Sequence, residues 1–258
     1  MRRSILKDLL ILLGVFALIW LLASLFNYPD KPKLLSIEKE ERLGEAYVDL
    51  ILLNPMFREL ENEKIDSAVS MIGDRLEANL EHSDYLYNFV VFDSKMINAF
   101  TVPGGNILIS SGLIAFCDSP EELASVMAHE MGHVEERHVV SRLIKELGID
   151  ILTSGDQYVL GEVTGLLTST SFDRKQEEEA DRFAAELLER SSIEPRTLAT
   201  FFRKLEEESD NELMKHFEII STHPNFSSRI REALSYEPAD DFKALPMDLD
   251  WEGIQAGL

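Results

Sequence analysis

The sequence contains a single cysteine, Cys117, among its 258 residues. An intramolecular disulfide is therefore impossible, and a zinc site built from several thiolates is excluded. In the short stretch FCDS, this thiol is expected to fill a small site in the core or in a loop and not to act as a nucleophile. Internal repeats and low-complexity blocks are also lacking, so the length indicates one substantial domain or at most two small ones.

Basic residues are scarce, with 25 lysines and arginines against 47 acidic residues and a formal net charge of -22. Such a chain repels phosphate backbones, which argues against nucleic acid as a partner. The same charge argues against electrostatic attraction to an anionic membrane surface. Its simplest consequence is solubility.

One long apolar run is present, from Leu9 to Phe26, and the basic residues Arg2, Arg3 and Lys7 precede it. A helix of this length nearly spans the hydrocarbon core of a bilayer, and the basic flank predicts a cytoplasmic N-terminus. We therefore predict one N-terminal transmembrane helix, an uncleaved anchor within residues 1–28, with the rest of the chain on the non-cytoplasmic, periplasmic or extracytoplasmic side. A cleaved signal peptide is the alternative.

Proline and charged residues predict a linker over residues 29–35, between the anchor and a domain that covers residues 36–240. Residues 241–258 form a tail that is expected to dock on this domain. Three apolar side chains of the tail are candidates for that contact: Leu245, Trp251 and Ile254.

The fold class predicted for the body is mainly α (α+β). A helix is expected over 37–53, and apolar residues at helical spacing predict a second one. Its buried stripe would contain Ile65, Ala68, Val69, Ile72, Leu76 and Leu80. Residues 87–93 and two short runs around the turn 102–106 predict a sheet of about three strands.

The stretch SVMAHEMGHVEERH lies in a predicted helix that Ser119 caps, with Pro120 in its first turn and Glu122 completing a capping box. The helix is expected to run to about Leu147. His129 and His133 are four apart, so they point to one side of it and can bind the same metal ion.

Glu130 lies about 100° around the helix from His129, where it can take a proton from a metal-activated water. Two histidines, a carboxylate base and an open position are typical of zinc hydrolases. His138 lies about 140° from His133 on a continuous helix, so it is expected to be a bystander. The competing interpretation is a solvated polar helix face rich in histidine.

A catalytic zinc site needs a third protein ligand. Residues 172–188 predict another helix, on which Glu177 and Asp181 share a face with small residues, and Gly132 offers room for its close approach. Glu177 could bind zinc and Asp181 could orient a ligand histidine. From spacing alone, an acidic surface run is the favoured interpretation of EEEAD.

Three segments together resemble one family: NAFTVPGGNILIS at 98–110, HEMGH at 129–133 and RKQEEEADRFA at 174–184. STHPNFSSRI at 221–230 also resembles a family element. The resemblance is to the membrane-associated HExxH zinc metallopeptidases that include the HtpX stress peptidase and the CAAX prenyl endopeptidase, here in a single-domain, membrane-tethered form.

This resemblance implies a gluzincin-type domain, helical with a small sheet that edges the active-site cleft. It implies one Zn²⁺ per chain, held by His129, His133 and Glu177, with Asp181 behind the ligands. It also places His223 and Arg229 near the site. His223 would stabilise the oxyanion or cap the zinc in a resting state, and Arg229 would serve the oxyanion or anchor its segment by a salt bridge.

The resemblance gives the NAF segment a role, because an edge strand can hydrogen-bond an extended substrate. Asn98, Ala99 and Phe100 are the candidate substrate-binding residues, and an ordinary covered sheet edge is the alternative.

The predicted function is a zinc-dependent endopeptidase with Glu130 as general base, acting in envelope protein quality control on protein or peptide substrates such as unfolded envelope proteins. The rival is a non-catalytic, client-binding or chaperone-like protein on the same fold, which would not need Glu130. A deformylase is a third option, but its cysteine ligand lies in a setting that Cys117 does not match.

Overall fold

The computed structural model describes residues 35–148, 163, 165–166, 171–208 and 218–258. The predicted anchor and nearly all of the predicted linker lie outside these residues. Within them, no helix combines the length and the apolarity needed to cross a bilayer. The described part is mainly helical with one small sheet, which agrees with the predicted fold class.

The sheet has three strands in the order β1-β3-β2, where β1 is Asn88–Phe92, β2 is Ala99–Val102 and β3 is Asn106–Ser110. β1 runs parallel to β3, whereas β2 runs antiparallel to it, with Phe100 opposite Leu108. The sheet is therefore mixed, and β2 forms one of its edges.

The predicted turn between β2 and β3 contains Gly104 and Gly105, whose φ angles are 77° and 83°. Glycine adopts this left-handed region without the steric cost of a Cβ atom. A Cβ at Gly104 would also lie 2.6 Å from the Cα of Glu41. The two glycines therefore allow both the turn and the close passage of the helix beside it.

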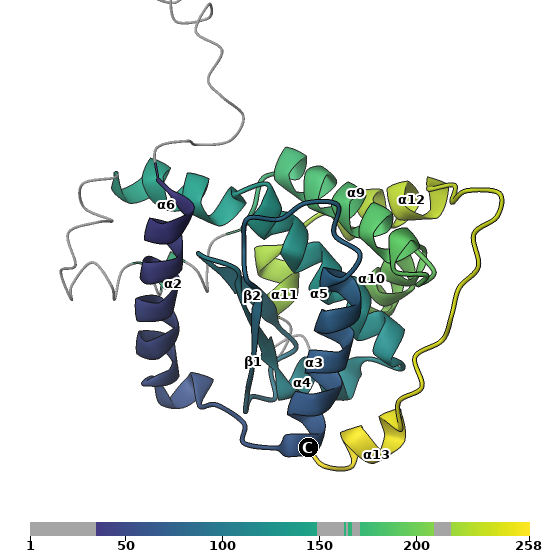
Figure 1. Cartoon of the computed structure of the whole chain (residues 1–258), viewed down its shortest axis with the longest axis horizontal. Coiled ribbons are helices and arrows are strands. Elements are labelled where there is room, and N and C mark those ends of the chain that lie inside the picture. The colour runs from purple at the N-terminus through teal and green to yellow at the C-terminus, as the bar shows by residue number, and fades with distance from the viewer. Residues whose placement is uncertain (1–34, 149–162, 164, 167–170, 209–217) are drawn as a thin grey trace, which may run out of the picture. The chain divides into compact units, whose positions relative to one another are not determined.

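Helices cover both faces of the sheet (Figure 1). β2 and β3 are buried along their whole length, whereas β1 is buried only at Val91 and Phe92. On one face pack α2 (Ile37–Leu52) and α6 (His138–Leu147); on the other pack α3 (Glu63–Glu77) and α5 (Pro120–Glu135). Alternating strand residues divide between these two cores, as the pleat requires. In β3, for example, Leu108 belongs to the first core, and Ile107 and Ile109 belong to the second.

The first two predicted helices are present with small differences. α2 ends at Leu52, one residue before the predicted end, and a short 3-10 helix, η1 (Pro55–Phe57), follows. Asn62 caps α3 by accepting hydrogen bonds from the backbone of Lys64 and Ile65. Leu80 lies beyond the end of α3, so it reaches the core from the following turn and not from the helix stripe.

The single helix predicted from Ser119 to Leu147 is wrong, because the chain breaks after α5 and restarts as α6. Arg137, between the two helices, adopts a left-handed conformation with φ 55°. Its guanidinium contacts the buried carboxylate of Glu40 and donates to the carbonyl of Leu35. These contacts compensate for a backbone conformation that is uncommon for a residue with a Cβ.

The start of α5 follows the predicted capping only in part. The Ser119 hydroxyl accepts a 3.3 Å hydrogen bond from the backbone N–H of Glu122, as an N-cap should. The Glu122 carboxylate does not complete the box on Ser119. It accepts instead from the backbone of Asp118 and from Lys204 Nζ.

The C-terminal part of the chain supplies α9 (Arg174–Arg190), α10 (Thr197–Glu208), α11 (Glu218–Thr222), α12 (Phe226–Ser235) and α13 (Trp251–Gln255). α9 packs along α5, and α10 packs on both α5 and α12. In the tail, Trp251 and Ile254 are buried in the core, whereas Leu245 is 59 % exposed. Leu245 therefore does not contribute the apolar contact expected of it.

Candidate metal centre

Four buried side chains from three parts of the chain meet at one point. His129 and His133 come from α5, Glu177 from the first turn of α9, and His223 from the residue after α11. One nitrogen or carboxylate oxygen from each lies within 4.8 Å of all the others. The two α5 histidines therefore lie on one side of the helix, as their spacing predicted, and Glu177 lies beside them.

The donor separations fit a tetrahedral zinc ion. The Nε2 atoms of His129 and His133 are 3.1 Å apart. Glu177 Oε1 is 3.5 Å from His133 Nε2, and Glu177 Oε2 is 3.6 Å from His129 Nε2. Zinc–ligand bonds of about 2.0–2.1 Å imply ligand–ligand separations of about 3.3 Å in a tetrahedron. Two imidazoles and a carboxylate at these distances fit one Zn²⁺ per chain.

The close approach of α9 to α5 brings Glu177 to the histidines. A Cβ added at Gly132 would lie 2.9 Å from the Cα and the carbonyl oxygen of Ala180. The small residues predicted to let these helices approach are thus in direct contact, one turn from the ligands. The absence of a side chain at position 132 is a condition for the site.

Behind the ligands, Asp181 connects a histidine to a buried arginine. Its Oδ1 lies 2.9 Å from Nδ1 of His129, which fixes the ring so that Nε2 faces the metal position. Arg229 donates two 2.7 Å hydrogen bonds to the same carboxylate. Burial opposes the charge on Asp181, but Arg229 outweighs burial and lowers the pKa of this carboxyl below its usual value.

Arg229 is itself 1 % exposed and lies within the site instead of at a substrate-facing surface. Its Nη1 is 2.5 Å from Glu177 Oε2, and its guanidinium lies 4.1 Å from the centre of the Phe202 ring. Since it pairs with both Glu177 and Asp181, this geometry favours the anchoring role over direct contact with an oxyanion.

His138 is not among the clustered metal-site residues, as the helix spacing predicted, but it contacts one of them. The break at Arg137 turns the chain back, so that Nδ1 of His138 lies 2.9 Å from Nδ1 of His133, and its Nε2 lies 3.3 Å from Glu179. The His133 ring also stacks on Phe172 at 3.8 Å. Burial lowers the pKa of His133 well below its ordinary value, which favours the neutral form that binds metal.

The carboxylate of Glu130 is fully buried beside the ligand cluster. Its Oε2 accepts a 2.7 Å hydrogen bond from the hydroxyl of Thr101. Its Oε1 accepts no hydrogen bond from the described residues and lies 3.4 Å from Nε2 of His223. One oxygen of the candidate base is therefore held in place, and the other faces the site.

The candidate substrate residues occupy the start of the edge strand. Asn98 precedes β2, and Ala99 and Phe100 are its first two residues; all three side chains are buried. The three are buried as whole residues, so the backbone at this edge is covered together with the side chains. The backbone N–H of Ile219 in α11 already donates to the carbonyl of Ile97 just before the strand.

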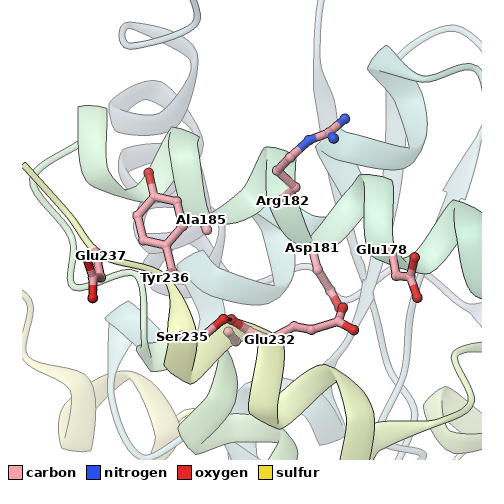
Figure 2. A pocket seen from close by; sticks show the side chains of 9 residues that line it. Glu178, Asp181, Arg182, Ala185, Glu232, Ser235, Tyr236 and Glu237 are labelled. Carbon is pink, nitrogen blue, oxygen red and sulfur yellow. Dashed lines mark hydrogen bonds between the residues drawn. The ribbon is translucent and has the colours of Figure 1, made fainter.

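A pocket of about 340 Å³ lies beside this centre, between α9 and α12 (Figure 2). Acidic residues and one arginine dominate its wall, which includes Asp181, Glu178, Arg182 and Glu232. None of the four clustered metal-site residues lines it. The pocket therefore borders the hydrogen-bond network of Asp181 without opening onto the metal position.

The model of peptidase family M48 matches residues 59–237, which contain the whole site. The chain belongs to peptidase family M48. It is 30% identical over 216 residues to the β-barrel assembly-enhancing protease of Escherichia coli (strain K12), covering 77% of this chain and 44% of that protein. It is 31% identical over 167 residues to the metalloprotease LoiP of the same organism, covering 60% and 65% respectively.

A mitochondrial relative also matches this M48 chain. It is the metalloendopeptidase OMA1 of Schizosaccharomyces pombe, 26% identical over 182 residues, which cover 68% of this chain and 54% of that protein. The chain thus spans less than half the length of the β-barrel assembly-enhancing proteases it matches.

Sequence reasoning missed two residues of this M48 site, Thr101 and His138. Alternation along the strand could have placed the Thr101 hydroxyl on the same face as Ala99, toward the next helix. No signal in the sequence predicted the left-handed residue that returns His138 to the site.

Proposed function

We propose that this protein is a zinc metalloendopeptidase that hydrolyses peptide bonds of protein substrates with Glu130 as its general base. One observation carries the proposal: a buried carboxylate, one of whose oxygens has no hydrogen-bond partner among the described residues, lies beside a cluster whose geometry fits zinc. A structural zinc site has no use for such a base. Membership of a peptidase family supports the same conclusion.

In this proposal His129, His133 and Glu177 hold the zinc, and Asp181 orients His129. The bound ion would polarise the scissile carbonyl and lower the pKa of the attacking water. Glu130 accepts the proton of that water as it attacks the carbonyl carbon, and then delivers it to the leaving amine. The burial of Glu130 keeps bulk water from competing for this proton.

His223 and Arg229 complete the proposed machinery. His223 sits with Nδ1 3.2 Å from His129 Nε2 and Nε2 3.4 Å from Glu130 Oε1, so it can cap the zinc at rest or stabilise the oxyanion once substrate binds. We assign Arg229 to positioning, because its guanidinium is committed to Asp181 and Glu177. The backbone of Asn98, Ala99 and Phe100 is the proposed docking edge for an extended substrate.

We further propose that the domain is tethered to a membrane by residues 1–28 and acts on the non-cytoplasmic side in protein quality control. The basic and apolar N-terminal sequence supports this location. Similarity to a β-barrel assembly-enhancing protease supports envelope proteins as substrates. A reporter fused after Lys33 tests the topology: cytoplasmic reporter activity would contradict it.

The substitution Glu130→Gln tests the catalytic proposal. The variant should retain stoichiometric zinc yet cleave an unfolded model protein at least about 100-fold more slowly, because the proton acceptor is lost. Glu186→Gln on the exposed face of α9 is the matched control and should cleave normally. Undiminished cleavage by Glu130→Gln would refute the mechanism. Full biological function of this variant without cleavage would favour the client-binding alternative.

A further inference from the structure

The hydroxyl of Thr101 makes a contact that connects the sheet to the candidate base. Thr101 lies on β2 and is 3 % exposed. Its Oγ1 is 2.7 Å from Oε2 of Glu130 and 3.1 Å from the backbone carbonyl oxygen of the same residue. Ala99, two residues earlier, belongs to the core that contains α5, whereas Phe100 belongs to the opposite core. The pleat of β2 therefore directs the Thr101 side chain toward α5.

A threonine hydroxyl has one proton to donate, and two oxygens of Glu130 lie within its reach. The carboxylate oxygen is the closer and carries the greater negative charge, so it is the preferred acceptor. Oε2 is then occupied by Thr101, while Oε1 accepts no hydrogen bond from the described residues. A single hydroxyl thus distinguishes two otherwise equivalent oxygens and fixes the plane of the carboxylate.

We propose that Thr101 is a positioning residue for the general base: it holds Oε2 of Glu130 and leaves Oε1 as the atom that accepts the proton of the attacking water. This inference rests on the proposed peptidase function. As the water oxygen bonds to the carbonyl carbon, its proton passes to Oε1, which later returns it to the amine nitrogen as the C–N bond breaks. Thr101 keeps its own proton throughout.

The location of Thr101 gives this contact a further consequence. Thr101 follows Ala99 and Phe100 on β2, the strand proposed to bind substrate. The same four-residue strand therefore positions both the extended peptide and the base that activates the water against it. A shift of β2 would misplace both, and misplacement by about 1 Å can reduce a rate by about 100-fold.

The test compares Thr101→Val with Thr101→Ser in the full-length, zinc-loaded protein. Valine keeps the shape but removes the hydroxyl, whereas serine keeps the hydroxyl. We expect the valine variant to keep its zinc and its KM, with kcat lower by about 10–100-fold. The serine variant should recover most of this loss. Thr200→Val, which removes an exposed threonine hydroxyl on α10, is the matched control and should be unaffected.

A second readout needs no turnover. If the hydroxyl acts through the Glu130 side chain, the melting-temperature shifts of Thr101→Val and Glu130→Ala should not add in the double variant, because alanine removes the acceptor. A valine variant with normal kcat, a serine variant as slow as valine, or loss of zinc from the valine variant would each overturn the inference. These results differ from failure of the proposed function itself, in which Glu130→Gln would remain active.

Discussion

At the scale of single residues, the site is defined by charges that have no access to water. Glu130, Glu177 and Arg229 are each at most 1 % exposed, and Asp181 is 6 % exposed. Unpaired charges at such positions would be strongly destabilising, so each must have a partner. Arg229 is the partner of two carboxylates, and zinc would supply the positive charge that remains to be matched. The polar core of the protein is thus also its proposed reaction centre.

The contact between His138 and His133 leads to a prediction about metal affinity. His138→Phe would remove the polar atom beside Nδ1 of His133, so the orientation of this ligand ring would be less constrained. Loss of such a supporting contact typically weakens metal binding by about 10–100-fold. Competition with a zinc chelator, read as residual zinc per chain, measures the effect.

The control is His82→Phe, because His82 is exposed and distant from the cluster. Its zinc retention should match that of the unmodified protein. Equal zinc affinity for His138→Phe and His82→Phe would mean that His138 only fills space beneath the site.

At the scale of secondary-structure elements, the packing of α9 against α5 decides whether the third ligand reaches the first two. We expect Gly132→Ala to force the helices apart, since the new Cβ would lie 2.9 Å from backbone atoms of α9. Overpacking of this kind costs about 1–3 kcal/mol of stability. Because α9 carries Glu177 and Asp181, zinc binding should weaken as well.

Gly73→Ala is the matched control, because Gly73 is also a crowded helical glycine. A Cβ added there would lie 2.5 Å from the ring of Phe89, and neither residue belongs to the metal cluster. Gly132→Ala should lower both the melting temperature and the zinc affinity, whereas Gly73→Ala should leave the zinc affinity unchanged, because its new Cβ meets only a side chain that can move. Retention of zinc by both variants would contradict the role assigned to the α5–α9 contact.

Lys204 connects α10 to the start of α5 and gives a pH-dependent prediction. Burial alone would lower its pKa, but Glu122 and Asp118 outweigh burial and raise it. The stabilisation is therefore complete below the ordinary lysine pKa of about 10.4 and is lost as pH rises through the raised value. The substitution Lys204→Met should reduce the free energy of unfolding by about 1–3 kcal/mol at neutral pH.

Urea unfolding at pH 7 and above pH 11 checks this prediction. The difference in the free energy of unfolding between Lys204→Met and the unmodified protein should be smaller at the higher pH. Lys64→Met, at an exposed position in α3, should show no such difference at either pH. If the difference in the free energy of unfolding did not change with pH, the destabilisation would come from lost packing and not from lost charge.

At the scale of the whole molecule, the sequence predicted what depends on local periodicity. Helical spacing put His129 and His133 on one side of a helix, and the glycine pair marked the turn between β2 and β3. Glu177 required a resemblance, because a carboxylate in an acidic run resembles any solvated residue. Thr101 could not be assigned, because its contact with Glu130 exists only once β2 packs on α5.

The docking of the tail gives the prediction at this scale. Trp251 is 8 % exposed, and its indole N–H donates a 2.9 Å hydrogen bond to the carbonyl of Cys117. Trp251→Ala should reduce the free energy of unfolding by about 3–5 kcal/mol. Leu245→Ala, at a 59 % exposed side chain, should change it by less than about 0.5 kcal/mol. Denaturant unfolding separates the two, and equal stabilities would show that the tail is dispensable.

The order of the site residues along the chain has a consequence for synthesis. Glu130 and the two helix histidines are translated early, but Glu177, His223 and Arg229 follow as many as a hundred positions later. Synthesis proceeds from the N-terminus, so a nascent chain lacks the ligand Glu177 until α9 has been made and lacks Arg229, which anchors the site, until α12 has been made. The site can therefore form only when most of the body, residues 36–240, is available to fold.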